Sequence, residues 1–278
     1  MINLLTEQNV TFIITTFNSR STIFDCLDSL NPGCKKIIIE NSNDEKLMIE
    51  IKKKYQNLSY KIMPDNCGYG KANNFGIRQS DTDYIFILNP DAKFKKNSFD
   101  KFINILIDKD FSIAAPIDLN DIKKINFKKN NLINVDSVQG FAMLLKKSSF
   151  TDFFDENFFL YLEEIDLCLR AKKNKKNIFL VNTPIIHIGG ASHGDKSNIE
   201  MEKSRNWHWM WSKFYFNKKH YGYFFGILQT LPNFINSIFK YIYYKFLDKT
   251  DKKEISKMRF LGLLNSYMLK KSSYRPYL

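Results

Sequence analysis

Three sets of polar residues have the types and spacing needed for chemistry. Asn89-Pro90-Asp91 directly follows the apolar run Tyr84 to Leu88. A carboxylate fixed at that point can hold Mg²⁺ or Mn²⁺ together with a diphosphate, because these cations prefer oxygen ligands. Glu163, Glu164 and Asp166 form an acidic cluster. Three carboxylates so close together repel one another, and this repulsion is offset where they contact a cation or a substrate. Both patterns also have plain structural explanations, a turn in the first case and favourable helix-dipole contacts in the second.

The third set is His187 with the glycine-rich stretch Ile188 to Gly194, which offers a nitrogen ligand beside a loop. A second glycine-rich stretch, Asp65 to Asn74, has the composition of a phosphate loop. It lacks the spacings G-x-x-x-x-G-K-[ST] and G-x-G-x-x-G, so it supports neither ATP binding nor dinucleotide binding. Its glycines can equally serve backbone conformations with positive φ.

These residues sit between alternating predicted strands and helices. Such alternation is typical of an α/β fold with a mostly parallel sheet flanked by helices, in which ligands bind beyond the carboxyl ends of the strands. The polar turns should therefore converge on one crevice. The predicted strands are 10–15, 36–39, 60–63, 84–88, 112–115, 138–146, 178–181 and 184–187. Helices are predicted within 21–30, 44–55, 71–78, 99–107 and 158–172 and from about 204 onwards, with a loop at 120–134.

Charge divides the chain unevenly. Residues 1–202 hold 27 Lys and Arg against 26 Asp and Glu, whereas residues 203–278 hold 15 against 3 and contain 20 of the 42 aromatic residues. A basic, aromatic tail of this kind is attracted to anionic surfaces. We expect the tail to attach to an anionic membrane surface, with Trp207, Trp209, Trp211 and the segment 214–216 at headgroup level. A helical cap on the domain and a homodimer contact are the alternatives.

The predicted cellular location follows from the N-terminal residues, the spacing of the cysteines and the longest apolar stretch. Residues 1–8 show no basic region followed by a long apolar stretch, so no signal peptide is expected. The four cysteines form no C-x-x-C pair, which favours free thiols in a cytoplasmic protein. The apolar stretch 221–246 is interrupted by polar residues and Pro232, so it suits a helix lying in the membrane interface rather than one crossing it. The predicted location is the inner face of the bacterial cytoplasmic membrane.

The order of the motifs resembles that of family 2 glycosyltransferases with the GT-A fold, and most closely the rhamnosyltransferase-like branch of bacterial surface-polysaccharide synthesis. The resemblance covers about residues 10–192, with one further string in the tail. The matching strings are TFIITTFNS (11–19), IIIENS (37–42), DNCGYGKANNFGI (65–77), IFILNPDA (85–92), QGFAMLLKK (139–147), FDENFFLYLEEIDLCLR (154–170), HIGGAS (187–192) and SKFYFNKKHYG (212–222).

The resemblance implies a catalytic domain at 1–203 and a helical extension at 204–278. The catalytic domain would comprise a nucleotide-sugar half at about 1–92 and an acceptor half at about 93–203. A divalent cation, Mn²⁺ or Mg²⁺, would be held by Asp91 and His187. Glu164 would be the general base, with Glu163 and Asp166 beside it. The implied donor-binding residues are Thr16, Phe17, Asn18, Glu40, Asn66, Gly70, Lys71, Asn73, Asn89 and Arg170.

Three positions depart from the family pattern. Glu40 replaces the usual Asp at the end of the second strand. Asn89 replaces the first acid of the D-x-D metal motif, which leaves Asp91 as the ligand most expected to remain. Glu164 is one methylene longer than the usual Asp, so Glu163 stays open as the base.

The expected reaction is an inverting transfer of a sugar from a nucleotide-sugar donor to a hydroxyl of a surface glycan or a lipid-linked glycan. The donor stays open between dTDP-rhamnose and a UDP-hexose. A nucleotidyltransferase that makes nucleotide sugars is an alternative, but the stretch TTFNSRST (15–22) has no glycine for a triphosphate loop. A basic nucleic-acid-binding protein is a second alternative. It is disfavoured because no nucleic-acid motif occurs, and no nucleic-acid partner is expected.

Overall fold

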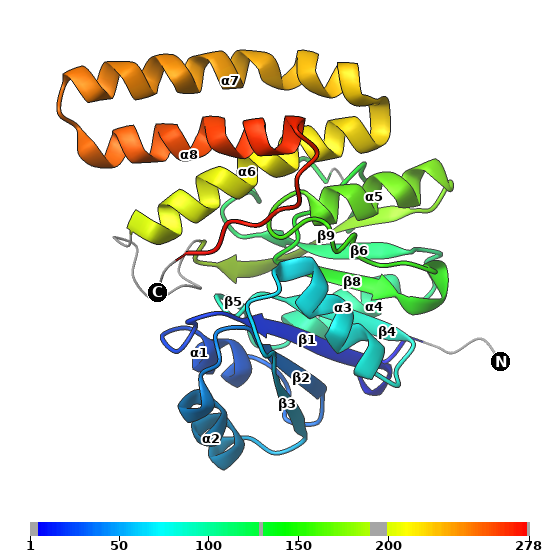
Figure 1. Ribbon diagram of the computed structural model, residues 1–278. Helices are drawn as coiled ribbons and strands as arrows, with labels where there is room; N and C mark the ends of the chain where they lie inside the picture. Colours follow the sequence, from blue (N-terminus) through cyan, green and yellow to red (C-terminus); the bar gives the residue numbers. More distant parts are fainter. Residues whose placement is uncertain (1–4, 128–129, 190–198, 277–278) are drawn as a thin grey trace. The chain divides into compact units, whose positions relative to one another are not determined.

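The computed structural model describes residues 5–127, 130–189 and 199–276. Strands and helices alternate along the first two-thirds of the chain, and helices alone follow (Figure 1). The strands are β1 (Val10–Thr16), β2 (Lys35–Glu40), β3 (Leu58–Ile62), β4 (Tyr84–Leu88), β5 (Ala92–Phe94), β6 (Ile113–Asp118), β7 (Leu132–Asn134), β8 (Ala142–Lys146) and β9 (Ile178–His187). The α-helices are α1 (Ile23–Asp28), α2 (Glu45–Lys54), α3 (Tyr69–Gln79), α4 (Ser98–Leu106), α5 (Glu163–Lys173), α6 (Ile199–Tyr221), α7 (Tyr223–Phe246) and α8 (Thr250–Tyr267), with short 3₁₀ turns at Glu7–Asn9 and Lys147–Ser149.

By packing, the described residues fall into two compact units. The first contains residues up to Phe154 and from Glu164 to the end of β9, and the second contains Asp155–Glu163 with α6, α7 and α8. The predicted division after residue 203 stays a prediction, and packing adds Asp155–Glu163 to the helical unit.

The first unit is built on one mixed sheet with the strand order β3-β2-β1-β4-β8-β6-β9-β5, and β7 also pairs with β9. β1, β2, β3 and β4 run parallel, as predicted, so their carboxyl ends share one edge. β8 runs antiparallel to both β4 and β6, and β5 runs antiparallel to β9. The α/β fold class is therefore confirmed.

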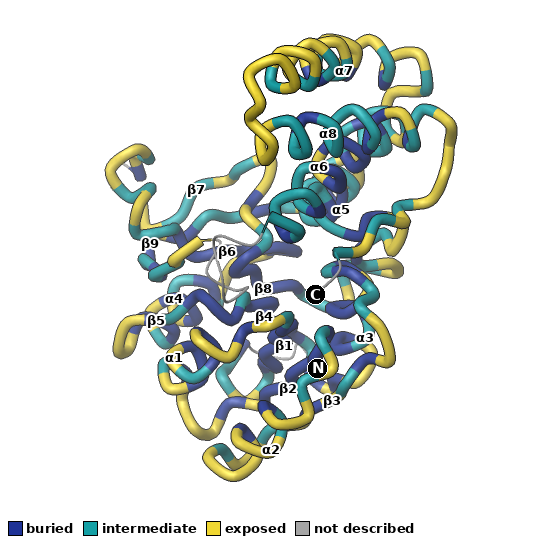
Figure 2. The backbone as a smooth tube through the Cα atoms, turned by 60° about the vertical axis from the view of Figure 1, so that its left-hand side comes forward, coloured by how far each residue is buried: buried dark blue, intermediate teal, exposed yellow. Residues whose placement is uncertain are grey.

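Side chains that alternate along the strands fill two cores, one on each face of the sheet. Phe12 and Phe86 point to one face, where they pack with Phe99 and Phe102 of α4. Ile13 points to the other face, where α3 and α5 pack. The central strands β1, β4, β6 and β8 are almost entirely buried, whereas β7 and much of β9 are only half-buried (Figure 2). Both faces of the sheet are thus covered, which is why the strands read as continuous apolar runs.

Several predicted boundaries were wrong. β8 begins at Ala142 rather than Val138, and β9 is one strand where two short strands were predicted. β7 lies at the end of the predicted loop 120–134, and β5 was not predicted. β5 and β7 have three residues each, which is too short for an alternation of polar and apolar residues to be recognised.

The second unit is a helical bundle with an aromatic interior. Trp207 and Trp211 of α6 are 3% and 4% exposed, and Phe214 is fully buried. The indole N–H of Trp211 donates to the Lys270 carbonyl, which ties the chain after α8 to α6. His208 contacts Ser272 and Tyr274, and burial lowers its pKa to about 3. The prediction that Trp207, Trp211 and Phe214 lie at headgroup level is therefore wrong, because they form this interior.

In the part of the chain that the structure describes, no helix combines the length and the apolar character needed to cross a bilayer.

Candidate active site

Strand pairing brings Asp91 and His187 together. Asp91 follows β4 and precedes β5, and β5 pairs with β9 so that Ala92 lies opposite His187. The backbone N–H of Ile188 also donates to the Asp91 carbonyl. As a result, His187 Nε2 lies 3.6 Å from Asp91 Oδ1. Two residues 96 positions apart in sequence thus meet at the edge of the sheet where the parallel strands end.

The Asp91 carboxylate is buried without a hydrogen-bond donor. Its residue is 3% exposed, and neither carboxylate oxygen accepts a hydrogen bond from any residue that the structure describes. An unsatisfied buried charge is costly, so such a group normally has a partner. A divalent cation meets this need, because carboxylate oxygen and imidazole nitrogen are both suitable ligands for Mn²⁺.

The described side chains supply only part of a coordination shell. Across residues 5–127, 130–189 and 199–276, no group of three or more His, Cys, Asp or Glu side chains is arranged to hold a metal ion. A cation beside Asp91 and His187 would therefore take its other ligands from a bound diphosphate or from water, which is usual for Mg²⁺ at phosphate sites.

A second carboxylate and an aromatic ring fix the imidazole of His187. Asp118, the last residue of β6, places Oδ2 3.5 Å from His187 Nδ1. The Phe141 ring stacks on the imidazole with 3.9 Å between the centroids and 7° between the planes. Asp118 was not among the predicted site residues, because the predicted strand ended at Ala115. The rule that selected Asp91, a polar residue at the end of a buried strand, would also have selected Asp118.

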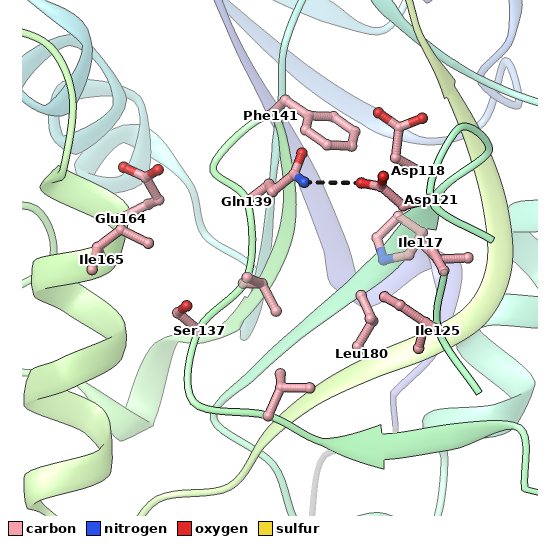
Figure 3. Close-up of a pocket in the computed structure, with 13 residues that line it drawn as sticks. Ile117, Asp118, Asp121, Ile125, Ser137, Gln139, Phe141, Glu164, Ile165 and Leu180 are labelled. Atoms are coloured by element: carbon pink, nitrogen blue, oxygen red, sulfur yellow. Dashed lines mark hydrogen bonds between the residues drawn. The ribbon is translucent and has the colours of Figure 1, made fainter. Parts of the chain in front are cut away.

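Glu164 lines a cavity of about 270 Å³ in the first unit. Figure 3 shows Glu164 and Ile165 on one side of this cavity and Asp118 and Asp121 on the other. Gln139 and Phe141 also line it, and Gln139 Nε2 donates to Asp121 Oδ2 over 3.3 Å. Phe141 connects this cavity to His187, because the same ring stacks on the imidazole.

Burial raises the pKa of the Glu164 carboxyl above its ordinary value, and the backbone N–H groups of Glu164 and Ile165 partly counter this. A raised pKa brings a carboxylate nearer to the range useful for a general base at neutral pH. Glu163 is buried and is not among the described residues that line the cavity. Of the two candidates for the base, Glu164 is thus the one that faces open space.

Tyr69 contacts both Asn89, at the end of β4, and Gly140, which packs against Glu164. The Tyr69 hydroxyl lies 2.9 Å from Asn89 Oδ1 and 2.8 Å from the Gly140 carbonyl. A Cβ atom at Gly140 would lie 3.2 Å from Cβ and Cγ of Glu164, so a glycine permits this close approach. Tyr69 and Gly140 lie within the family-like strings 65–77 and 139–147, but neither was among the predicted site residues.

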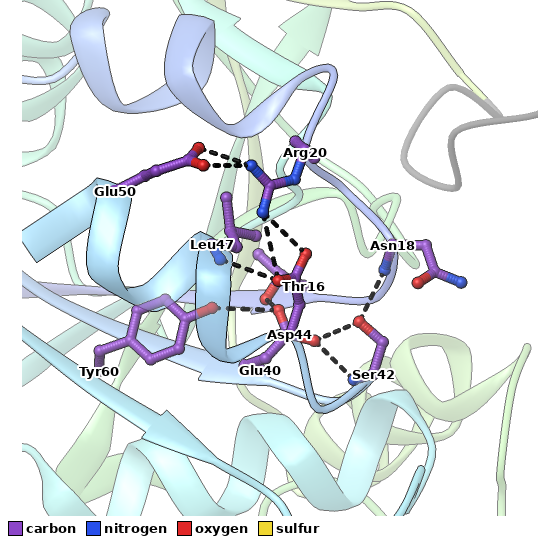
Figure 4. A network of polar contacts seen from close by, with 9 residues as sticks. All are labelled: Thr16, Asn18, Arg20, Glu40, Ser42, Asp44, Leu47, Glu50 and Tyr60. Carbon is purple, nitrogen blue, oxygen red and sulfur yellow. Dashed lines mark hydrogen bonds and ion pairs between the residues drawn. The ribbon is translucent and has the colours of Figure 1, made fainter.

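The predicted donor residues near β1 and β2 form a network around Glu40 (Figure 4). The buried Glu40 carboxylate accepts hydrogen bonds from the hydroxyls of Thr16 and Tyr60 and from the backbone N–H and the hydroxyl of Ser42. The Ser42 hydroxyl in turn accepts from the backbone N–H of the exposed Asn18. Glu40 therefore has its oxygens occupied within the protein and fixes the turn that presents Asn18, while Phe17 is half-buried beside it.

The predicted donor residues of the 65–74 segment differ in exposure. Gly70 and Asn73 are buried in α3, and Asn73 Oδ1 accepts from the Thr15 hydroxyl over 3.0 Å. Lys71 is exposed. Asn66 Oδ1 accepts from Asn41 Nδ2 over 3.0 Å and from the Gly68 backbone N–H over 3.1 Å. Gly68 has a φ of 86°, so the glycine here provides the positive φ that precedes α3.

Asp166 and Arg170 lie one helical turn apart on α5. Arg170 Nε donates to the fully buried Asp166 over 2.8 Å, and its other nitrogens donate to the carbonyls of Asp152 and Phe153. The amide of Asn74 on α3 holds the next residue, Phe154, through its backbone N–H and carbonyl. These contacts fix the segment before α5, and the predicted contacts of Arg170 with a donor and of Asp166 with a substrate stay predictions.

The predicted glycine-rich segment at 190–194, including His193, lies outside the described residues.

Comparison with curated proteins finds two related transferases. A hexosyltransferase of low-salt glycan biosynthesis, Agl10 of Haloferax volcanii, is 25% identical over 198 residues, which are 62% of this chain and 64% of that protein. The rhamnosyltransferase WbbL of Escherichia coli K12 is 28% identical over 239 residues, which are 72% of this chain and 89% of that protein. The match thus spans somewhat less than two-thirds of the first relative's length.

Solved structures share the fold at low sequence identity. A mannosyltransferase from Pyrobaculum calidifontis, in complex with GDP-Man and Mn²⁺, has a TM-score of 0.57 at 10% identity, with 95% of this chain and 88% of that chain covered. GalNAc-T7 with UDP, GalNAc and Mn²⁺ has a TM-score of 0.56 at 11% identity, with 84% and 58% covered. S. aureus TarS (residues 1–349) has a TM-score of 0.52 at 12% identity, with 94% and 92% covered.

The family profile described as glycosyl transferase family 2 matches residues 11–170, which include β1 to β8 and most of α5. The matched segment contains Asp91 and Glu164, together with the Glu40 network. The chain therefore belongs to glycosyl transferase family 2 and has the GT-A fold.

Proposed function

We propose that this protein is an inverting glycosyltransferase that moves a sugar from a nucleotide-sugar donor to a hydroxyl of a glycan or a lipid-linked glycan. The observation that carries the proposal is the Asp91 carboxylate, buried and without a hydrogen-bond donor beside His187. The two curated relatives are a hexosyltransferase and a rhamnosyltransferase, which supports sugar transfer. Family membership also favours this function over nucleotide-sugar synthesis and over nucleic-acid binding.

Asp91 and His187 would hold a divalent cation. Two structural neighbours are complexes with Mn²⁺ and a nucleotide or nucleotide sugar, which supports a cation at this position. When bound, such a cation neutralises charge on a departing diphosphate, which typically lowers the activation free energy by several kcal/mol. Asn89 replaces a carboxylate next to this site, so one negative charge fewer faces the cation than in a D-x-D motif.

The other side chains of the site would position the reactants and move the proton. Asp118 and Phe141 hold the imidazole of His187 in one orientation. An acceptor hydroxyl in the cavity beside Glu164 attacks the anomeric carbon of the donor, and the bond from that carbon to the diphosphate oxygen breaks. Glu164 takes the hydroxyl proton, which typically contributes a factor of about 10²–10⁴ in rate. Attack opposite the leaving group inverts the configuration at the anomeric carbon.

The turn that carries Asn18, fixed by Ser42 and Glu40, lies at the carboxyl ends of β1 and β2 and is proposed to contact the nucleoside. The sugar remains a choice between rhamnose from dTDP-rhamnose and a hexose from a UDP-sugar. A cytoplasmic location also stays a proposal from the sequence.

A thermal-shift screen identifies the donor, and a transfer assay tests the function. The purified chain is heated with dTDP-rhamnose, UDP-hexoses or GDP-mannose in the presence of Mn²⁺, and a bound donor raises the melting temperature. The stabilising donor is then incubated with glycan acceptors, and the product is examined by mass spectrometry and NMR. A product with inverted anomeric configuration is expected. A product that retains the donor's configuration would contradict the single displacement, and stabilisation by none of the donors would contradict the proposal itself.

A further inference from the structure

One face of α7 carries a continuous stripe of large apolar side chains that face solvent. Phe224 and Phe246, at its two ends, are 81% and 85% exposed. The spacing of three, four or seven positions places all members on one side of the helix. The α7 stripe consists of Phe224, Leu228, Leu231, Ile235, Phe239 and Phe246, each more than one-third exposed. Soluble monomers rarely leave so long an apolar surface in water without a function.

The opposite face of α7 is built around small residues. Gly226, Thr230 and Ser237 are the buried residues of this helix, with half-buried Ile227 and Phe234 beside them. The hydroxyls of Thr230 and Ser237 each donate to the carbonyl four residues earlier, which satisfies them within the helix. A Cβ atom at Gly226 would lie 3.0 Å from the Phe214 ring, so the glycine allows close helix packing.

The contact side of α7 thus combines three small buried residues with the larger, half-buried Tyr223, Ile227 and Phe234, while the large side chains of the stripe face solvent. Water-soluble bundles place large apolar residues inside. Helices that pack in lipid use small residues at their contacts and leave large apolar residues facing the hydrocarbon. The small residues at the contact and the exposed large residues of the stripe therefore favour a lipid-like environment on the stripe side.

The charge of α7 identifies the kind of surface. The segment 223–247 contains Lys240 and Lys245 and no acidic residue. At about 100° per residue, Lys245 lies about 80° to one side of the middle of the stripe and Lys240 about 140° to the other, so the two lysines border the exposed side of the helix. Both are exposed, and after the helix Asp248 and Lys249 follow with opposite charges. A second copy of the chain would bring the same positive charge to the stripe, whereas anionic phospholipids bring the opposite charge.

We propose that α7 lies along the surface of an anionic bilayer, with the α7 stripe among the headgroups and upper acyl chains and with Lys240 and Lys245 at lipid phosphates. α7 lies within the stretch 221–246 that the sequence predicts to be an interfacial helix, and the structure identifies the stripe as its exposed apolar side. The headgroup contacts predicted for Trp207 and Trp211 are no part of this proposal, because both are interior residues of the bundle. This inference does not depend on the proposed sugar transfer.

Vesicle flotation of the full chain tests the proposal. Vesicles of phosphatidylcholine alone are compared with vesicles that also contain phosphatidylglycerol. The first variant is F224Q/L228Q/F239Q, and its matched control is I49Q, which changes an isoleucine on α2 that is 63% exposed. A second variant, K240Q/K245Q, tests the charges. Circular dichroism confirms that each variant is folded, which is expected because the changed side chains face solvent.

The wild-type chain and I49Q are expected to float with the anionic vesicles. F224Q/L228Q/F239Q should bind at least about tenfold more weakly, because apolar burial provides much of the affinity of interfacial helices. K240Q/K245Q should lose the preference for phosphatidylglycerol. Failure of the wild-type chain to float, or equal flotation of F224Q/L228Q/F239Q, would overturn the proposal. A lipid-free dimer that this triple variant converts to a monomer, as measured by light scattering, would assign the stripe to a second copy instead.

Discussion

At the scale of single residues, the buried carboxylates of the site differ in how many hydrogen bonds they accept from the protein. Glu40 has both carboxylate oxygens occupied by protein donors, whereas Asp91 has neither occupied by a described residue. Asp166 is likewise engaged by Arg170. Carboxylates already satisfied by the protein fix the backbone, and a buried carboxylate that lacks a donor is the better candidate for a ligand contact. This difference separates Asp91 from Glu40 and Asp166 in a way that the sequence cannot show.

Replacing Glu164 with Gln should abolish sugar transfer and stabilise the protein at neutral pH. Because the folded-state pKa of Glu164 is raised, the folded chain keeps this proton over a pH range in which the unfolded chain has lost it. Stability from this group is therefore complete below the unfolded pKa and decreases as pH rises through the folded pKa. Glutamine removes that cost, so the melting temperature at pH 7 should rise while turnover is lost.

The raised pKa of Glu164 also determines how the transfer rate falls at acidic pH. Transfer by the wild-type enzyme should decrease on acidification at a pH above the ordinary pKa of a glutamate, because the protonated carboxyl cannot act as a base. The companion variant Glu163→Gln should keep measurable transfer. Near wild-type turnover by Glu164→Gln, together with loss of turnover in Glu163→Gln, would move the base to Glu163.

Replacing Asp118 with Asn should weaken Mn²⁺ binding without unfolding the protein. Asp118 lies on the Nδ1 side of the His187 ring, so its carboxylate favours the tautomer that leaves Nε2 free as a ligand. Loss of such a partner typically weakens metal affinity by about 10–100-fold. Titration calorimetry with Mn²⁺ and a nucleoside diphosphate measures the change. Asp121→Asn is the matched control, since Asp121 lines the same cavity and interacts with Lys124 and Gln139. Equal weakening by both variants would contradict a specific role for Asp118.

At the scale of elements, strand ends and close helix contacts create the site. β5 is only three residues long, yet its pairing with β9 places His187 next to Asp91. The strands with continuous apolar runs, such as β1 and β4, were predictable from sequence. β5 and β7 were not, because three residues carry too little pattern and their formation depends on β9 as a partner. The sequence therefore singled out Asp91 and His187, but neither the strand that brings them together nor Asp118 on the other side of the imidazole.

A glycine also allows two helices of the bundle to approach each other closely. A Cβ atom at Gly262 of α8 would lie 2.3 Å from the Trp207 carbonyl oxygen of α6, so Gly262→Ala must push two helices apart. Overpacking of this kind typically costs about 1–3 kcal/mol. Gly33→Ala is the control, because no atom lies within 4 Å of its Cβ position. Urea denaturation should show the loss only for Gly262→Ala, and an equal effect of the two substitutions would contradict this account of the bundle.

At the scale of the whole molecule, one chain combines a near-neutral α/β unit and a basic helical unit. The charge division and the family were both evident from sequence, since the family profile covers residues 11–170. The exposed apolar surface was only partly evident, because the sequence assigned both the stretch 221–246 and Trp207 and Trp211 to a membrane surface. The tail is aromatic throughout, and only packing determines that Trp207 and Trp211 turn inward while Phe224 and Phe246 remain exposed. Composition identifies a tail that can bind a surface, and tertiary structure selects the residues that face it.

The central claim is that Asp91 and His187 bind a divalent cation together with the diphosphate of a donor. Titration calorimetry with dTDP and with UDP, each with Mn²⁺ and with EDTA, tests it most directly on the wild-type chain and on Asp91→Asn. We expect Mn²⁺-dependent binding of at least one nucleotide by the wild-type chain, and binding at least about tenfold weaker by Asp91→Asn because the variant loses the charged ligand. Equal nucleotide binding with Mn²⁺ and with EDTA, unchanged in Asp91→Asn, would contradict the claim.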